Sequence, residues 1–124
     1  MLIPDDLRYT NEHEWIRIEG DIAVVGLTDY AQDQLEDIVY LDLPEPGMQV
    51  KQHDAFGSVE AVKAVEDIYS PVSGELVEVN SELEDKPELC NQKPYGDGWL
   101  VKIKMSDTSE VDNLLTAEQY RELL

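Results

Sequence analysis

The sequence predicts a mostly β protein, a small barrel or sandwich with helices only at its margins. Short runs of β-branched and aromatic residues recur along the chain, and glycine and proline turn signals separate them. Many short strands at this spacing are typical of two packed sheets or a small barrel. The 124 residues fit one domain and no linker divides them, so we expect a single domain over residues 1–124.

The expected strands are short apolar stretches set among charges or bounded by turn residues. They are residues 14–18, 22–27, 38–43, a segment near 48, 55–60, 65–69, 75–79 and 99–105. The first two should form a hairpin, because Gly20-Asp21 supplies a turn between them. Pro44-Glu45-Pro46-Gly47 should end the strand over 38–43, because proline cannot donate a hydrogen bond to a ladder.

Two short helical segments are expected between the strands. Thr28 or Asp29 can cap a helix that runs through Leu35, because their side chains accept hydrogen bonds from the first turn. Ser81-Glu82-Leu83-Glu84 has the spacing of a capping box, which predicts a helical turn. This turn should stop before Pro87, since the residue before a proline avoids the helical region.

The end of the chain, from about residue 107, is expected to be helical. Val111, Leu114 and Leu115 have the spacing of residues that share one helix face. Thr116-Ala117-Glu118-Gln119 is a second capping box, so a helix should begin there.

The net charge of −19 bears on the partners of this protein. Such a surface repels nucleic acid and anionic membranes and attracts basic proteins. No stretch approaches the roughly 20 apolar residues of a membrane span, and no signal peptide is visible at the N-terminus. Cys90 is the single cysteine, so we expect no intrachain disulfide, a buried or half-buried thiol and a reducing cytoplasm.

Independent catalysis is not expected from the motifs present. His13 and His53 are the only histidines, and no pair of histidines and cysteines has the spacing of a metal site. Phosphate-binding glycine loops and a nucleophile elbow are absent from the sequence. We therefore expect neither a metal nor a catalytic residue.

Lys63 stands out among nine basic residues because of its setting. The runs over 56–62 and 64–67 can pair as a hairpin that holds this lysine at or near its tip. Its small neighbours (Gly57, Ala61 and Ala64) leave space around the lysine side chain. The pattern alone favours an ordinary solvated lysine, because the Asn-Gly or Asp-Gly signal of a tight hairpin is missing.

Four stretches, however, resemble one known family. They are E-A-V-K-A-V-E-D-I-Y-S-P-V-S-G-E over 60–75, L-R-Y-T with E-H-E-W over 7–15, V-G-L-T-D-Y-A-Q over 25–32, and P-Y-G-D-G-W over 94–99. Together and in this order they resemble the glycine cleavage H proteins, from about Leu7 to Leu124. The resemblance implies a barrel-sandwich hybrid of the lipoyl and biotinyl type, with a C-terminal helix. It also implies that Lys63 carries lipoate in an amide on its Nζ.

The resemblance further implies what such a chain would do. It would carry an aminomethyl group from a pyridoxal-phosphate glycine decarboxylase to a tetrahydrofolate-dependent aminomethyltransferase, and electrons to dihydrolipoyl dehydrogenase. A lipoate ligase, or an octanoyltransferase with lipoyl synthase, would modify it. The chemistry of glycine breakdown and one-carbon transfer would belong to these partners. We expect a monomeric carrier, cytoplasmic in a bacterium or in the mitochondrial matrix of a eukaryote.

In this family the loaded arm folds back into a cleft on its own protein. A carboxylate beside the amine favours the charged ammonium, which cannot expel the sulfur that holds it. The matching positions are Glu14 and Asp67, with Glu12 nearby, and we expect these to hold the amine. His13 is expected to be structural, or else to line the cleft.

Two other interpretations stay open at this level. An H-like protein that hands lipoyl groups to other complexes would have the same residues around Lys63. An acidic β domain that binds a basic partner would carry no cofactor at all. A biotin carrier is not favoured, because the Met-Lys-Met type of acceptor motif is missing.

Overall fold

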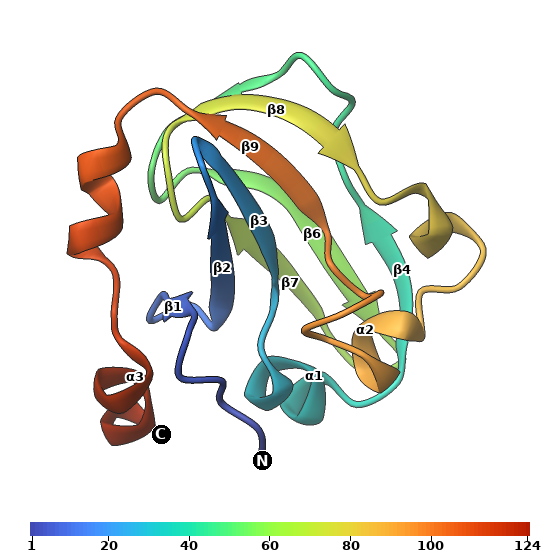
Figure 1. Cartoon of the computed structure of the whole chain (residues 1–124). Helices are drawn as coiled ribbons and strands as arrows, with labels where there is room; N and C mark the ends of the chain where they lie inside the picture. Colours follow the sequence, from blue (N-terminus) through green and yellow to red (C-terminus); the bar gives the residue numbers. More distant parts are fainter.

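The computed structural model describes residues 1–124 as two antiparallel sheets that enclose the core (Figure 1). The larger sheet has the order β1 (Arg8–Tyr9), β2 (Glu14–Glu19), β3 (Ile22–Leu27), β9 (Val101–Met105), β8 (Gly74–Val79) and β5 (Gln49–Val50). The smaller sheet has the order β4 (Ile38–Asp42), β6 (Ala55–Ala61) and β7 (Val65–Tyr69). The predicted mostly β architecture, a barrel-sandwich hybrid with small helices, is confirmed.

The helices lie at the ends of the sheets (Figure 1). They are α1 (Asp29–Leu35), the 3-10 turn η1 (Ser81–Glu84), α2 (Leu89–Gln92), the 3-10 segment η2 (Thr108–Asn113) and α3 (Ala117–Leu123). Thr28 caps α1 by accepting a hydrogen bond from Ala31 N, and Thr116 forms the predicted capping box with Gln119. The cap of η1 is Asn80 and not Ser81, because the Asn80 side chain accepts from Glu82 N.

The first half of β2 and most of β3 are buried on both faces, because two clusters of apolar side chains flank them. Ile16 packs in the main cluster between the two sheets, whereas Trp15, the next residue on β2, packs in a second cluster under α3. Alternate side chains of a strand point to opposite faces, so this strand contacts both clusters. Gly26 is opposite Trp15 in the ladder, and a Cβ at Gly26 would lie 2.6 Å from the indole ring. Glycine is therefore required there by close packing.

The C-terminal segment differs from the single helical face that its spacing predicts. Val111 and Leu114 pack against the main cluster, but Leu115 contacts the second cluster and forms a bridge with Tyr9. The helical conformation ends before Leu114, whose backbone is extended. The predicted shared face is therefore wrong: an extended connection between η2 and α3 lets neighbouring leucines reach different clusters.

Two elements were not predicted. Strand β1 has only two residues, and it forms because Tyr9 pairs with Trp15 on one side and Leu115 on the other. Helix α2 has four residues and no side-chain cap. It carries Cys90, which is buried as expected, and burial raises the pKa of this thiol to about 12.

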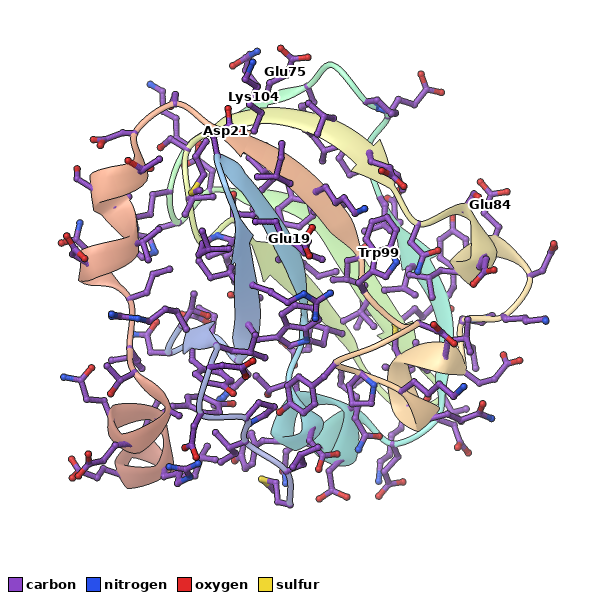
Figure 2. The ribbon with its side chains drawn as sticks, in the orientation of Figure 1. Glu19, Asp21, Glu75, Glu84, Trp99 and Lys104 are labelled. Atoms are coloured by element: carbon purple, nitrogen blue, oxygen red, sulfur yellow. The ribbon has the colours of Figure 1, made fainter.

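Except for the buried Glu14, the charged side chains of the strands are exposed or half-buried. Figure 2 shows Glu75, Lys104 and Asp21 close to one another at one end of β8 and β9, and Glu84 on η1 away from them. Glu75 and Lys104 face each other in the β8–β9 ladder. None of the helices combines the length and the apolar character that crossing a bilayer requires.

Candidate functional site

Lys63 lies at the tip of the hairpin formed by β6 and β7. Glu60 pairs with Val65 at the end of the ladder, and Ala61 N donates to Ala64 O at 2.8 Å across the turn. Val62 and Lys63 are thus the two exposed residues of a tight connection. The Lys63 side chain is 61% exposed.

This turn does not need the Asn-Gly signal that the sequence lacks. Neither Val62 nor Lys63 has a positive φ, so the turn avoids the left-handed conformations that favour asparagine and glycine. Gly57 has a different role from the one expected, since it is opposite Ile68 and away from the tip. A Cβ at Gly57 would lie 2.4 Å from Asp42 O, so glycine there allows β4 to approach β6.

The connection between α1 and β4 holds the tip of the hairpin. Asp37 O accepts from Val62 N at 3.1 Å, and Glu36 Oε1 lies 2.9 Å from Lys63 Nζ. Asn91 of α2 fixes this connection, because its side chain accepts from Ile38 N and donates to Glu36 O. The backbone of the turn is thereby anchored while the lysine side chain stays in solvent.

A cavity of about 360 Å³ opens beside the tip. Its walls come from β2 and the turn before it, from β3, α1, β6 and β7, and from the turn between the last two. The residues are Glu12, His13, Glu14, Leu27, Tyr30, Ala31, Gln34, Leu35, Val59, Ala64, Glu66, Asp67 and Tyr69. All four predicted cleft residues are therefore in one cavity. A larger hollow of about 680 Å³ lies between β4, β8 and η1, and none of the predicted site residues lines it.

Glu14 is the buried polar group of this cavity, with only 1% of the residue exposed. Its Oε1 accepts from Thr10 Oγ1 at 2.6 Å, and its Oε2 accepts from Tyr69 N at 3.2 Å. Burial raises the pKa of the carboxyl to about 8, although both hydrogen bonds favour the charged form and lower it. A pKa of about 8 means that the Glu14 carboxyl is mostly protonated at pH 7.

The other carboxylates of the cavity, Glu12, Glu66 and Asp67, are exposed and lie at its rim. Asp67 shares its face of β7 with Tyr69, because the two residues are two positions apart. The negative charge of Asp67 raises the pKa of the Tyr69 hydroxyl. The cavity thus combines one buried carboxyl with a negative rim.

His13 has both expected attributes, since its ring lines the cavity and also makes an internal contact. His13 Nδ1 lies 2.8 Å from the hydroxyl of Tyr120, and the ring is 4.6 Å from that of Tyr30. Its backbone has a φ of 70°, which is uncommon for a residue other than glycine. Burial lowers the pKa of His13, and the charge of Glu12 opposes this shift.

Sequence reasoning missed the aromatic and apolar walls of the cavity. Tyr30 and Gln34 are one helical turn apart on α1, and Tyr69 follows Asp67 on the same strand face. These spacings were visible in the sequence. The side of the hairpin against which α1 packs was not, so the residues could not be assigned to a common site.

The comparisons with known proteins agree with one another. Residues 7–124 match the family model described as the glycine cleavage H-protein. A glycine cleavage system H protein of Symbiobacterium thermophilum is 56% identical over 118 residues, which cover 95% of this chain and 92% of that protein. One of Staphylococcus carnosus is 49% identical over 124 residues, covering 100% of this chain and 98% of that protein.

A solved structure supports the same relationship. The crystal structure of a glycine cleavage system H protein from Mycobacterium marinum superimposes with a TM-score of 0.89. The two proteins are 40% identical, and the match covers 97% of each chain.

Proposed function

The chain belongs to the glycine cleavage H-protein family, a family of lipoyl carriers of the glycine cleavage system, and we propose that Lys63 is its attachment residue. The observation that carries the proposal is the place of Lys63 at an anchored, exposed turn directly beside the cavity. Acylation needs an amine that a modifying enzyme can reach. Because the attachment point is rigid, only the arm is flexible. The tether raises the effective concentration of the arm's end at each partner.

The residues of the cavity fit a lipoyl arm. Leu27, Leu35 and Val59 offer apolar surface to an aliphatic chain, and Ala64 leaves room beside the attachment point. Glu14 offers a buried carboxyl to a polar end group. Lipoate, when bound, supplies a dithiolane whose sulfur atoms accept the aminomethyl group and electrons.

Glu14 is proposed to protonate the amine cargo and then to hold the resulting ammonium group. When a neutral amine enters, the carboxyl can give it the proton, and the resulting carboxylate and ammonium attract each other in a buried site. Thr10 and the amide of Tyr69 then stabilise the carboxylate, because both donate to it. The amine stays charged for as long as it stays in the cavity.

Asp67 and Glu12 are proposed to assist from the rim of the cavity. Both are exposed, so their attraction for the ammonium is screened by water and is weaker than that of Glu14. Their charges also bring the cationic end of the arm back to the cavity mouth.

The full proposal is a non-catalytic shuttle. The chain would carry the aminomethyl group from glycine decarboxylase to the folate-dependent aminomethyltransferase, and electrons to dihydrolipoyl dehydrogenase. We propose that residues 1–124 act as one carrier domain, modified by a lipoate ligase or by an octanoyltransferase with lipoyl synthase. The bacterial relatives support a cytoplasmic location.

Mass mapping tests the attachment residue. After incubation with lipoate, ATP and a lipoate ligase, the chain is expected to gain one lipoyl group, on the peptide that contains Lys63. Lys93 is a matched control, because its side chain is 62% exposed and also lies near one carboxylate, at 3.4 Å from Asp97. Lys93→Arg should be modified like the wild type. A lipoyl group on Lys93, or on any lysine other than Lys63, would refute the assignment.

Hydrolysis of the amine cargo tests the cavity residues. Release of ammonia and formaldehyde from the loaded chain is expected to be about tenfold faster in Glu14→Ala, if the carboxylate contributes one pKa unit to the amine. Asp67→Ala should have a smaller effect in the same direction. Glu84→Ala is the control, since Glu84 lies on η1 outside this cavity (Figure 2). Wild-type rates in both cavity variants would reject their role.

A further inference from the structure

A chain of three polar side chains connects the cavity with the C-terminal helix. Tyr120 of α3 is fully buried, and its hydroxyl lies 2.8 Å from His13 Nδ1 and 2.8 Å from Thr28 Oγ1. Tyr120 is also stacked on Tyr9, with 4.7 Å between the ring centroids. The ring of His13 lines the cavity, whereas Thr28 and Tyr120 do not. The two hydroxyls therefore act on the cavity only through His13.

The donors and acceptors available in this hydrogen-bonded series fix which group donates in each contact. Thr28 Oγ1 accepts from Ala31 N, so its own hydrogen needs a separate acceptor, and Tyr120 Oη is the one within reach. Tyr120 Oη then receives that hydrogen and has its own hydrogen to donate. His13 Nδ1 is the remaining partner and must accept it. A neutral imidazole that accepts at Nδ1 carries its proton on Nε2.

We propose that Thr28 and Tyr120 are positioning residues that hold His13 as the neutral tautomer protonated on Nε2. The inference rests on the proposed function, because it concerns the same cavity. The ligand concerned is a primary ammonium group, here the cargo amine, and the effect on it is electrostatic. In this tautomer the His13 ring is uncharged, so no imidazolium at the cavity wall repels the ammonium.

Some groups around His13 favour its charged imidazolium form, and others favour its neutral form. Glu12 of its own segment favours a charged imidazolium, since its charge raises the pKa of His13, and the exposed carboxylates of Glu66 and Asp67 on β7 act in the same direction. The Glu14 carboxyl does not, because its raised pKa keeps it largely uncharged. The neutral hydroxyl in contact with it is that of Tyr120, and the ring of Tyr30 packs against it. Protonation of Nδ1 would reverse the direction of both hydrogen bonds and leave the hydrogen of Thr28 without an acceptor. The hydroxyl chain thus opposes the attraction of the three exposed carboxylates.

Nitrogen NMR of the unmodified chain tests the tautomer directly. In ¹⁵N-labelled wild-type protein at pH 7, His13 is expected to show an unprotonated Nδ1 and a protonated Nε2. Tyr120→Phe should give a mixture of tautomers and raise the titration midpoint of His13 by about 0.5–1 pH unit, the equivalent of one hydrogen bond. Tyr9→Phe is the matched control: it removes a hydroxyl from the same stacked pair, but one that donates to Pro4 O.

Thr28→Ser should behave like the wild type, because serine keeps both the cap and the hydroxyl. A proton on Nδ1 in the wild type would overturn the proposal, and so would identical nitrogen shifts in Tyr120→Phe and Tyr9→Phe. In the loaded chain, Tyr120→Phe should lose its cargo about threefold faster than Tyr9→Phe; equal rates would refute the effect on the ligand. The tautomer can be measured even if Lys63 proves not to be the attachment residue, so the two proposals fail separately.

Discussion

Replacing Lys63 with arginine is expected to abolish glycine–bicarbonate exchange in a mixture with glycine decarboxylase. A guanidinium stays protonated at working pH and is not acylated, so no arm can be attached. Arginine keeps the positive charge that lies beside Glu36, and the turn is held through backbone contacts of Val62 and Ala61. The variant should therefore fold normally and lose only the carrier activity. Exchange of labelled bicarbonate measures the effect.

The control is Lys93→Arg, which changes an equally exposed lysine and should retain full exchange. The same assay separates the competing interpretations. A lipoylated wild-type chain that supports no exchange would point to a lipoyl relay. A chain that a competent ligase leaves unmodified would point to an acidic interaction domain. Exchange that persists in Lys63→Arg would contradict the proposed attachment residue.

Replacing Glu14 with glutamine is expected to change how stability depends on pH. In the unfolded chain this carboxyl ionises near its ordinary value of 4.5, but in the folded chain its pKa is raised to about 8. Between these values the folded state binds the extra proton, so the free energy of unfolding falls as pH rises. The shift corresponds to roughly 5 kcal/mol at most, fully lost above about pH 8.

Glutamine cannot ionise, so the free energy of unfolding of the variant should not fall in this way as pH rises. Near pH 5 it should be less stable than the wild type by about 1 kcal/mol, because an amide oxygen can accept from Thr10 or Tyr69 but the amide nitrogen cannot. Between pH 5 and 9 it should gain several kcal/mol relative to the wild type. Urea unfolding across this range measures the difference.

The exposed Glu12→Gln variant serves as the reference for the general effect of removing one negative charge. Its stability relative to the wild type should change little between pH 5 and 9, since exposed charges interact weakly. If Glu14→Gln and Glu12→Gln gave the same pH profile, Glu14 would not carry the raised pKa that its proposed proton transfer needs.

Local sequence signals predicted most of the strands. The hairpin of β2 and β3, the helix capped by Thr28, and the capping box at Thr116 were all predicted from turn and cap residues. Such signals depend on neighbours in the sequence, which is why they were readable. The errors concern segments whose conformation depends on distant contacts. Strand β1 exists through Trp15 and Leu115, and Leu115 leaves the helical pattern to reach Tyr9.

The sequence by itself determined the family and the candidate residues, because motifs spread over the chain are read without coordinates. It also placed Lys63 between two runs that pair. The resemblance already placed Glu12, Glu14 and Asp67 in one cleft. Only the tertiary structure decided that Glu14 is buried whereas Asp67 is exposed, and that Tyr30 and Tyr69 line the same cavity. Burial is a property of how distant segments pack, and burial is what raises the pKa of Glu14. The link from His13 to Tyr120 likewise spans 107 positions and arises only from packing of α3.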